Sequence, residues 1–207
     1  MEQNFHCLRN LRPLFSLLVF LFQWYPQQAA LAGVFNLPHF IAPGTFSLGI
    51  EPELVLTSGA GIGINFKYTQ GLSDLLNASG IIGTGSGPNR FRAGGNLAFD
   101  LFPDAEGQPG IGIGIQGLYY RLKNNGRFDL TTIPYLHKAL MSQGGEFEPF
   151  LALPFGIGIQ SGDDAAVSTL TLGSLFKPNE NFRYVIELGV AINNTESYVS
   201  GGFIYYH

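Results

Sequence analysis

Charged side chains are scarce in this chain, and six of them fall where they would share one face of extended, alternating segments: Glu51, Lys67, Arg92, Asp100, Arg183 and Glu187. Inside a closed sheet, such residues have two interpretations. They could line a small pore and set ion selectivity, or they could pair and plug the interior, because a desolvated charge without a partner is costly. A barrel of about ten strands or fewer is nearly filled by its side chains, which favours the plug.

Histidines are the residues that could support hydrolysis, beside a serine or a carboxylate. His39, His137 and His207 remain after the first 32 residues. One alternative hypothesis is that the protein is a barrel hydrolase. It predicts that replacing His137 abolishes a hydrolytic activity while the barrel stays folded. The neighbouring Lys138 favours an interfacial polar residue instead, so we assign no catalytic residue, no metal site and no cofactor. The glycine runs continue as period-two strands with no helix behind them, which excludes a phosphate-binding loop.

The first 32 residues have the order of a secretory signal peptide. Arg9 and Arg12 precede the apolar run 14–22, and Ala30-Leu31-Ala32 gives a small-residue cleavage site before Gly33. The apolar run is shorter than the roughly 20 residues of a membrane-spanning helix. We therefore expect residues 1–32 to be removed, residues 33–44 to form a short N-terminal segment, and residues 45–207 to form one domain.

Composition sets this domain apart from an ordinary soluble one. Charged residues make up 13 % of the chain, which carries 28 glycines, 18 phenylalanines and a net charge of −4, whereas a soluble domain is about 25 % charged. No basic patch is present for nucleic acid. The only cysteine, Cys7, lies in the predicted signal peptide, so disulfides and thiolate metal sites are excluded from the mature chain.

Strict alternation of apolar residues with glycine or polar residues predicts β-strands, as in the stretches 61–68, 91–101 and 111–119. Turn residues such as Gln70-Gly71 and Asn124-Asn125-Gly126 separate the runs. The pattern predicts about ten strands, with eight or twelve as alternatives: 45–56, 60–69, 74–84, 90–102, 110–122, 127–137, 147–160, 165–176, 181–193 and 196–207. The longest connections, 103–110 and 138–146, then lie at the same end as both termini.

The glycine-rich face would make a poor solvated surface, whereas it fits a narrow lumen with the aliphatic and aromatic face turned to lipid. Ile113→Arg and Ile157→Arg should then impair insertion, and Gly112→Ser should be mild. The alternative is a secreted soluble β-sandwich, in which the Ile/Phe face is dry between two sheets. A closed, antiparallel, up-and-down transmembrane β-barrel is the predicted fold class.

The final strand carries four aromatic residues, Tyr198, Phe203, Tyr205 and Tyr206, before His207, which partly fits an alternating aromatic pattern. With the alternation over 45–207, this resembles the small bacterial outer-membrane β-barrels of the OmpA/OmpX-like class, although a terminal histidine departs from their aromatic last residue. The resemblance implies an outer-membrane location, a structural or narrow-channel role, and as partners membrane lipid, the barrel assembly machinery and periplasmic chaperones. We expect an aromatic girdle at the membrane interfaces, made of Tyr68, Tyr119, Tyr184, Tyr198 and Tyr205.

Overall fold

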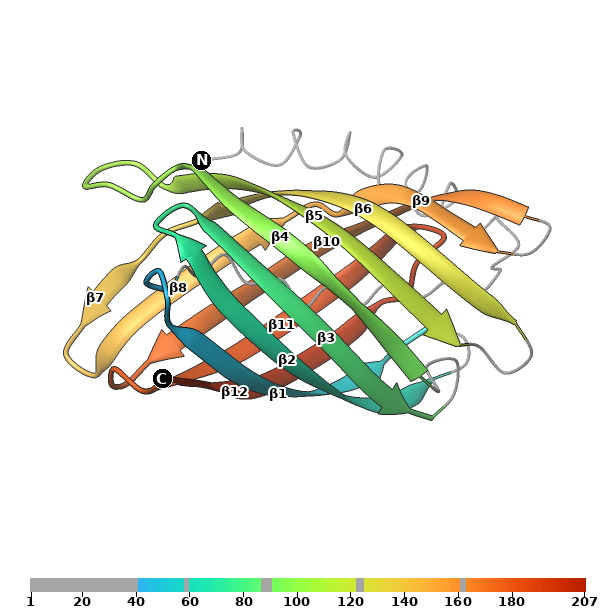
Figure 1. The fold of residues 1–207 in the computed structure, drawn as a ribbon, viewed down its shortest axis with the longest axis horizontal. Coiled ribbons are helices and arrows are strands. Elements are labelled where there is room, and N and C mark those ends of the chain that lie inside the picture. Colours follow the sequence, from blue (N-terminus) through green and yellow to red (C-terminus); the bar gives the residue numbers. More distant parts are fainter. Residues whose placement is uncertain (1–40, 58–59, 87–90, 122–124, 161–162) are drawn as a thin grey trace, which may run out of the picture.

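A computed structural model describes residues 41–57, 60–86, 91–121, 125–160 and 163–207. The predicted signal peptide and most of the segment 33–44 lie outside these residues. Within them, no helix is long and apolar enough to cross a membrane. The strands, shown in Figure 1, are β1 (Phe46–Val55), β2 (Gly61–Ser73), β3 (Leu76–Gly85), β4 (Phe91–Phe102), β5 (Gly110–Arg121), β6 (Gly126–His137), β7 (Leu140–Ser142), β8 (Gly145–Ala152), β9 (Phe155–Gln160), β10 (Asp163–Lys177), β11 (Phe182–Asn193) and β12 (Tyr198–Tyr206).

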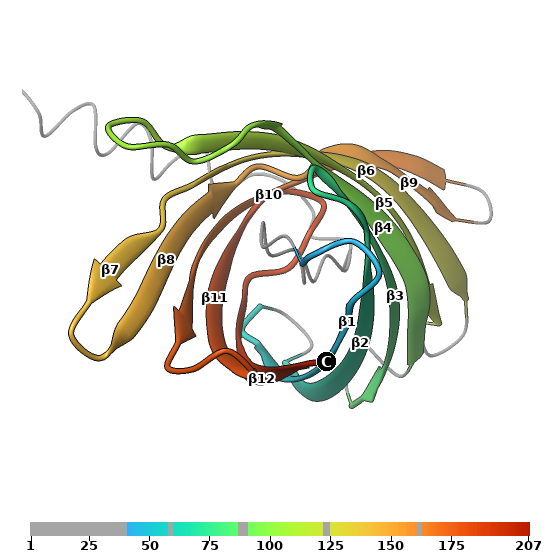
Figure 2. The same cartoon turned by 60° about the vertical axis from the view of Figure 1, so that its left-hand side comes forward.

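The strands form one antiparallel sheet that closes on itself. β1 to β6 pair in chain order, β6 pairs with β8 and β9, both of these pair with β10, and β10, β11 and β12 pair in order, with β12 pairing back to β1. Reciprocal backbone hydrogen bonds between Phe46 and His207, of 3.2 and 3.0 Å, complete the seam at the chain end. Figure 2 shows the resulting ring of strands. Closure leaves no long unpaired edge, as a sheet in a bilayer requires.

β8 and β9 together form one strand-length crossing of the barrel wall, which is interrupted at Pro154. Ala152 pairs with Thr171 and Phe155 with Ser168, so the register against β10 is the same on both sides of Pro154. Against β6 the register is also continuous, from Tyr135–Ala152 to Thr132–Phe155. Because proline has no N–H to complete the ladder, the strand is interrupted without being shifted. Counted as crossings, the barrel has ten strands, which confirms the predicted number and the single strand predicted over 147–160.

The turn predicted at Gln70-Gly71 is wrong, because β2 continues to Ser73 and pairs there with Leu76 of β3. Gly71 instead allows the backbone of residues 42–45 to lie close to β2. Its N–H donates to the carbonyl of Thr45, its carbonyl accepts from the N–H of Gly44, and a side chain at this position would collide with the carbonyl of Ala42. The glycine therefore lets the segment before β1 pack against β2. The short strand β7, which pairs with the start of β8, was not predicted.

The two faces of the wall differ as the alternation predicts. Large apolar side chains point outward and are exposed along every crossing, for example Ile62 at 67 % and Ile157 at 49 %. Polar and charged side chains point inward and are buried, among them Glu51, Asn65 and Thr171. The secreted-sandwich alternative is wrong on this point, because it requires the Ile/Phe face to be dry.

Inward glycines accommodate the large side chains of the neighbouring strands. Tyr135 of β6 lies over its cross-strand partner Gly112, and Tyr198 of β12 lies over its partner Gly189. A side chain at either glycine would overlap the tyrosine ring. The glycines therefore let these rings lie along the wall rather than project across the interior.

The two ends of the barrel carry different connections. The last residues of β1, β3, β5, β9 and β11 lie at the end away from the described termini, together with the first residues of the strands that follow them. The loop 103–109 and the β7–β8 hairpin extend from the end where β1 starts and β12 finishes (Figure 1), which is the end that the strand count assigns to them.

Candidate functional site

All six charged residues predicted for the interior are on the inward face of their strands. Five of them are buried, and only Arg183 is partly exposed. The guanidinium of Arg183 lies 4.2 Å from the centre of the Tyr206 ring, a cation–π contact within β11 and β12. The remaining five lie at three positions along the barrel, although Glu51 also interacts electrostatically with Arg92.

The first group lies on β1, β2 and β11 and is called here the central glutamate group: Glu51, Lys67 and Glu187. The ammonium of Lys67 interacts electrostatically with both carboxylates. Glu187 accepts a hydrogen bond of 3.3 Å from the hydroxyl of Tyr198. Among the described residues, neither carboxylate oxygen of Glu51 and only one of Glu187 has a hydrogen-bond partner. Two carboxylates thus share one ammonium at this level of the lumen.

Nearer the end away from the termini, Arg92 of β4 reaches across β3 and β2 to Glu53 of β1. Its Nη2 lies 2.7 Å from the Glu53 carboxylate, which also accepts a 3.3 Å hydrogen bond from the side-chain amide of Asn65. Gly83 of β3 lies beneath the Arg92 side chain. This ion pair spans three strand interfaces and neutralises both charges.

Glu196 lies near this pair, in the connection between β11 and β12. Burial raises the pKa of its carboxyl to about 7, with a further contribution from the charge of Glu53, while the nearby Thr57 hydroxyl and the charge of Arg92 act in the opposite direction. This carboxyl therefore changes charge near neutral pH at one end of the barrel.

A second ion pair joins two residues of the same face of β6. Nε of Arg127 lies 2.5 Å from the carboxylate of Asp129, and both side chains are buried. The guanidinium also lies over Gly158 of β9. Neither residue was predicted as part of the interior charge network.

The third group lies at the end that carries the termini and is called here the histidine group: Asp100, His137 and Glu148. Nδ1 of His137 lies 2.8 Å from the Glu148 carboxylate and its Nε2 lies 3.6 Å from that of Asp100. The neighbouring Tyr135 hydroxyl donates a 2.9 Å hydrogen bond to the carbonyl of Phe99 across β5. The group ties β4, β6 and β8 together, so His137 is an interior residue and its predicted interfacial position is wrong.

Outside the wall at the same end, Lys138 holds the loop 103–109. Its Nζ donates to the carboxylate of Asp104 at 2.6 Å and to the carbonyls of Ala105 and Gln108, while the N–H of Ala139 donates to Asp104. Partial burial alone would raise the pKa of Asp104, but the hydrogen bonds from Lys138 and Ala139 lower it below its ordinary value.

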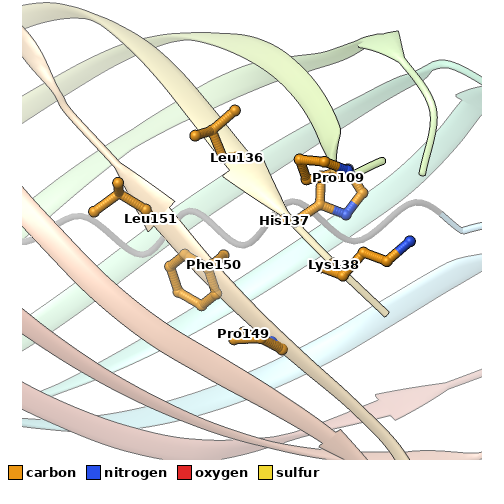
Figure 3. Close-up of a pocket in the computed structure, with 7 residues that line it drawn as sticks. All are labelled: Pro109, Leu136, His137, Lys138, Pro149, Phe150 and Leu151. Atoms are coloured by element: carbon orange, nitrogen blue, oxygen red, sulfur yellow. The ribbon is translucent and has the colours of Figure 1, made fainter. Parts of the chain in front are cut away.

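A shallow pocket of about 270 Å³ adjoins this region, as Figure 3 shows. Its lining is almost entirely apolar, with His137 and Lys138 as the polar members: Pro109, Leu136, His137, Lys138, Pro149, Phe150 and Leu151. No serine, threonine or cysteine lies in this lining, so the pocket does not bring a hydroxyl or thiol nucleophile to the imidazole.

Four of the five tyrosines predicted for the girdle are exposed on the outer surface. Tyr68, Tyr184 and Tyr205 lie near the end with the termini, where Tyr68 stacks on Phe46 with ring centres 5.8 Å apart, and Tyr119 lies toward the other end. The assignment of Tyr198 is wrong. Its ring is 0 % exposed and faces the lumen, because it is an odd number of positions from the outward-facing Phe203 and Tyr205.

Sequence reasoning missed six interior residues: Glu53, Arg127, Asp129, His137, Glu148 and Glu196. For five of them the signal was present. Glu53 has the same parity as Glu51, and Glu148 alternates with the outward Phe147 and Leu151. Glu196 lies in a connection, where period-two alternation gives no information.

Many inward polar atoms have no direct partner in the described part of the chain. Besides the glutamate oxygens, they include the side-chain N–H₂ of Gln116 and the hydroxyls of Thr131, Thr169 and Ser200. Native interiors leave few such atoms unsatisfied. In the same residues, no group of three or more histidine, cysteine, aspartate or glutamate side chains could hold a metal ion. The interior is therefore polar beyond what its own contacts satisfy.

A closed antiparallel barrel of ten crossings, apolar outside and polar inside, defines the class of transmembrane β-barrels. No family model matches the chain, and no curated protein matches it. Solved structures are similar to it, including the following two. One is a transmembrane β-barrel designed de novo, with 13 % identity and a TM-score of 0.41 over 82 % of this chain and 100 % of that one. The other is an outer membrane channel from Pseudomonas putida F1, with 8 % identity and a TM-score of 0.48 over 85 % and 100 %.

Proposed function

We propose that the protein is an integral outer-membrane β-barrel that acts as a narrow channel with a hydrated, polar lumen, and that it performs no catalysis. The observation that carries the proposal is the set of buried inward polar atoms without partners, above all the carboxylate of Glu51. An unsatisfied buried polar group costs about 1–3 kcal/mol, and a charged one more. Water in the lumen removes this cost.

The non-catalytic part of the proposal rests on the surroundings of His137. Both ring nitrogens face carboxylates, and neither faces a hydroxyl or thiol among the contacts of the described residues. A general base needs one nitrogen directed at the nucleophile. Such an imidazole is suited to holding strands together.

The outer-membrane location is supported by two independent features. The sequence begins with a signal-like order of residues, and the apolar side chains of all crossings face outward. Cell fractionation tests the location directly: the protein should be found with the outer membrane and should require detergent for extraction. Recovery in the soluble fraction would contradict it.

Conductance tests the channel. Protein extracted from membranes should first show a heat-dependent mobility shift and a β-type far-UV circular dichroism spectrum, which establish a folded barrel. Reconstituted in a planar bilayer in KCl, it should then produce discrete small conductance steps. A folded barrel that gives no current above that of the lipid alone would exclude the channel and leave a purely structural role.

A further inference from the structure

The central glutamate group differs from the other interior charges in its lack of compensation. Glu53 is paired with Arg92, Asp129 with Arg127, and Glu148 with His137. Glu51 and Glu187, in contrast, lie beside the ammonium of Lys67 and interact with each other unfavourably, and Arg92, which also attracts Glu51, is already paired with Glu53. With all three groups charged, this level of the lumen has a local charge of −1.

The backbone of Glu51 is fixed by a neighbouring strand, and its side chain packs against the wall. Asn65 donates a 3.1 Å hydrogen bond to the backbone carbonyl of Glu51, fixing the strand at this point. The side chain is bordered by two glycines: a Cβ added at Gly202 would lie 3.0 Å from Cγ of Glu51, and one at Gly49 would lie 3.6 Å from Oε1. The residue is 1 % exposed, yet in the described part of the structure both oxygens lack a hydrogen-bond donor.

From this geometry we propose that Glu51 and Glu187 form a binding position for a small inorganic cation inside the lumen, and that they make the channel cation-selective. Resting on the proposed channel function, this inference names the class of solute that the channel takes. A monovalent cation at this position would satisfy oxygens that the protein leaves unpartnered, and rings or pairs of carboxylates select cations in narrow pores by the same attraction.

The role of Lys67 follows from its place between the two carboxylates. Its ammonium lowers the negative potential at this level without cancelling it. Lys67 therefore limits how strongly a cation is held, as conduction requires that an ion leave as well as enter. Removing the ammonium should strengthen cation preference, and removing the carboxylates should weaken it, which gives two variants with opposite expected effects.

The test is the reversal potential across a planar bilayer that separates two KCl concentrations. The wild-type protein should favour K⁺ over Cl⁻. The double variant Glu51→Gln/Glu187→Gln changes the local charge from −1 to +1 and should lower the permeability ratio by at least about five-fold, since a single charge about 4 Å away in water already changes the local cation concentration by that factor. Lys67→Gln should raise the ratio. Glu180→Gln removes one charge from an exposed turn outside the lumen and should leave the ratio unchanged.

A conducting wild-type channel that prefers anions or neither ion would overturn the inference, and so would an unchanged ratio in the double variant. Absence of any conductance from a folded barrel would instead overturn the channel function itself, so the two failures are distinguishable. The mobility shift on heating verifies the folding of each variant. Should the double variant not fold, single Glu51→Gln replaces it, with a smaller decrease expected and no decrease contradicting the proposal.

Discussion

The central glutamate group and the histidine group lie in the same lumen but are built in opposite ways. In the histidine group, each ring nitrogen of His137 faces a carboxylate, one on β4 and one on β8. In the central group, Glu51 has no hydrogen-bond partner for its carboxylate among the described residues. The comparison indicates that one group serves to hold strands and the other to meet water and ions, a division that mutation can test.

The largest effect is expected when the histidine group is broken. His137→Leu leaves two carboxylates facing each other without a cation, and it should destabilise the barrel by about 3–5 kcal/mol. Glu51→Gln removes a charge that has no direct partner and should change stability by less than about 1 kcal/mol. Urea unfolding in lipid vesicles measures both. Equal losses would show that the two groups are not built differently.

The next effect concerns the outer face, on which the inward position of both groups depends. Ile157→Arg places a charge in the apolar belt and should destabilise the inserted barrel by about 2–4 kcal/mol. Asn181→Arg adds the same charge in an exposed turn and serves as the control. The heat-dependent mobility shift and urea unfolding report insertion. Normal insertion of the Ile157→Arg protein would mean that the faces have been exchanged.

Two inward glycines of β5 sharpen the comparison next to the histidine group. A side chain at Gly112 would overlap the ring of Tyr135, whereas one at Gly114 would meet Cβ of Ile133 at 3.4 Å. Gly112→Ser should therefore cost about 1–3 kcal/mol by displacing the ring, and Gly114→Ser should cost less than about 1 kcal/mol. The expectation from sequence that Gly112→Ser is mild is wrong on this geometry. Similar unfolding midpoints for the two variants would contradict the role of the glycine.

The last effect is a dependence on pH at the end away from the termini. Since the pKa of Glu196 is raised from 4.5 to about 7, the folded state holds this proton to higher pH than the unfolded state. Its contribution to stability should fall as pH rises from 4.5 to about 7 and stay constant above. Urea unfolding between pH 4 and 8 should show this decline in the wild type and less of it in Glu196→Gln. Identical profiles would contradict the shift.

Period-two alternation was enough to predict the crossings and to place the six charges inside. It works because one side of each strand meets lipid and the other meets the lumen, so a single apolar residue fixes the direction of its neighbours. The same rule, applied to every strand, would have placed Glu53, Asp129 and Glu148 inside and would have excluded Tyr198 from the girdle. The girdle residues were chosen by type, and residue type alone does not fix the direction of a side chain.

Other features depend on distances between strands and could not be predicted from local pattern. Which carboxylate pairs with Arg92 depends on barrel curvature, because Glu53 lies three strands away. The extension of β2 past Gln70-Gly71 depends on contact with the segment before β1. The turn residues there are a weaker influence than the backbone hydrogen bonds that continue the sheet.

The proline-interrupted crossing makes one part of the wall weaker than the rest. Leu153 donates a 3.0 Å hydrogen bond to the carbonyl of Pro134, and Thr169 donates one of equal length to Pro154, but neither proline can return it. Two adjacent strand interfaces thus lose a donor at nearly the same height. In hydrogen–deuterium exchange, amides beside this seam should gain deuterium before those of β1 and β2, so that local opening of the barrel begins between β6 and β10.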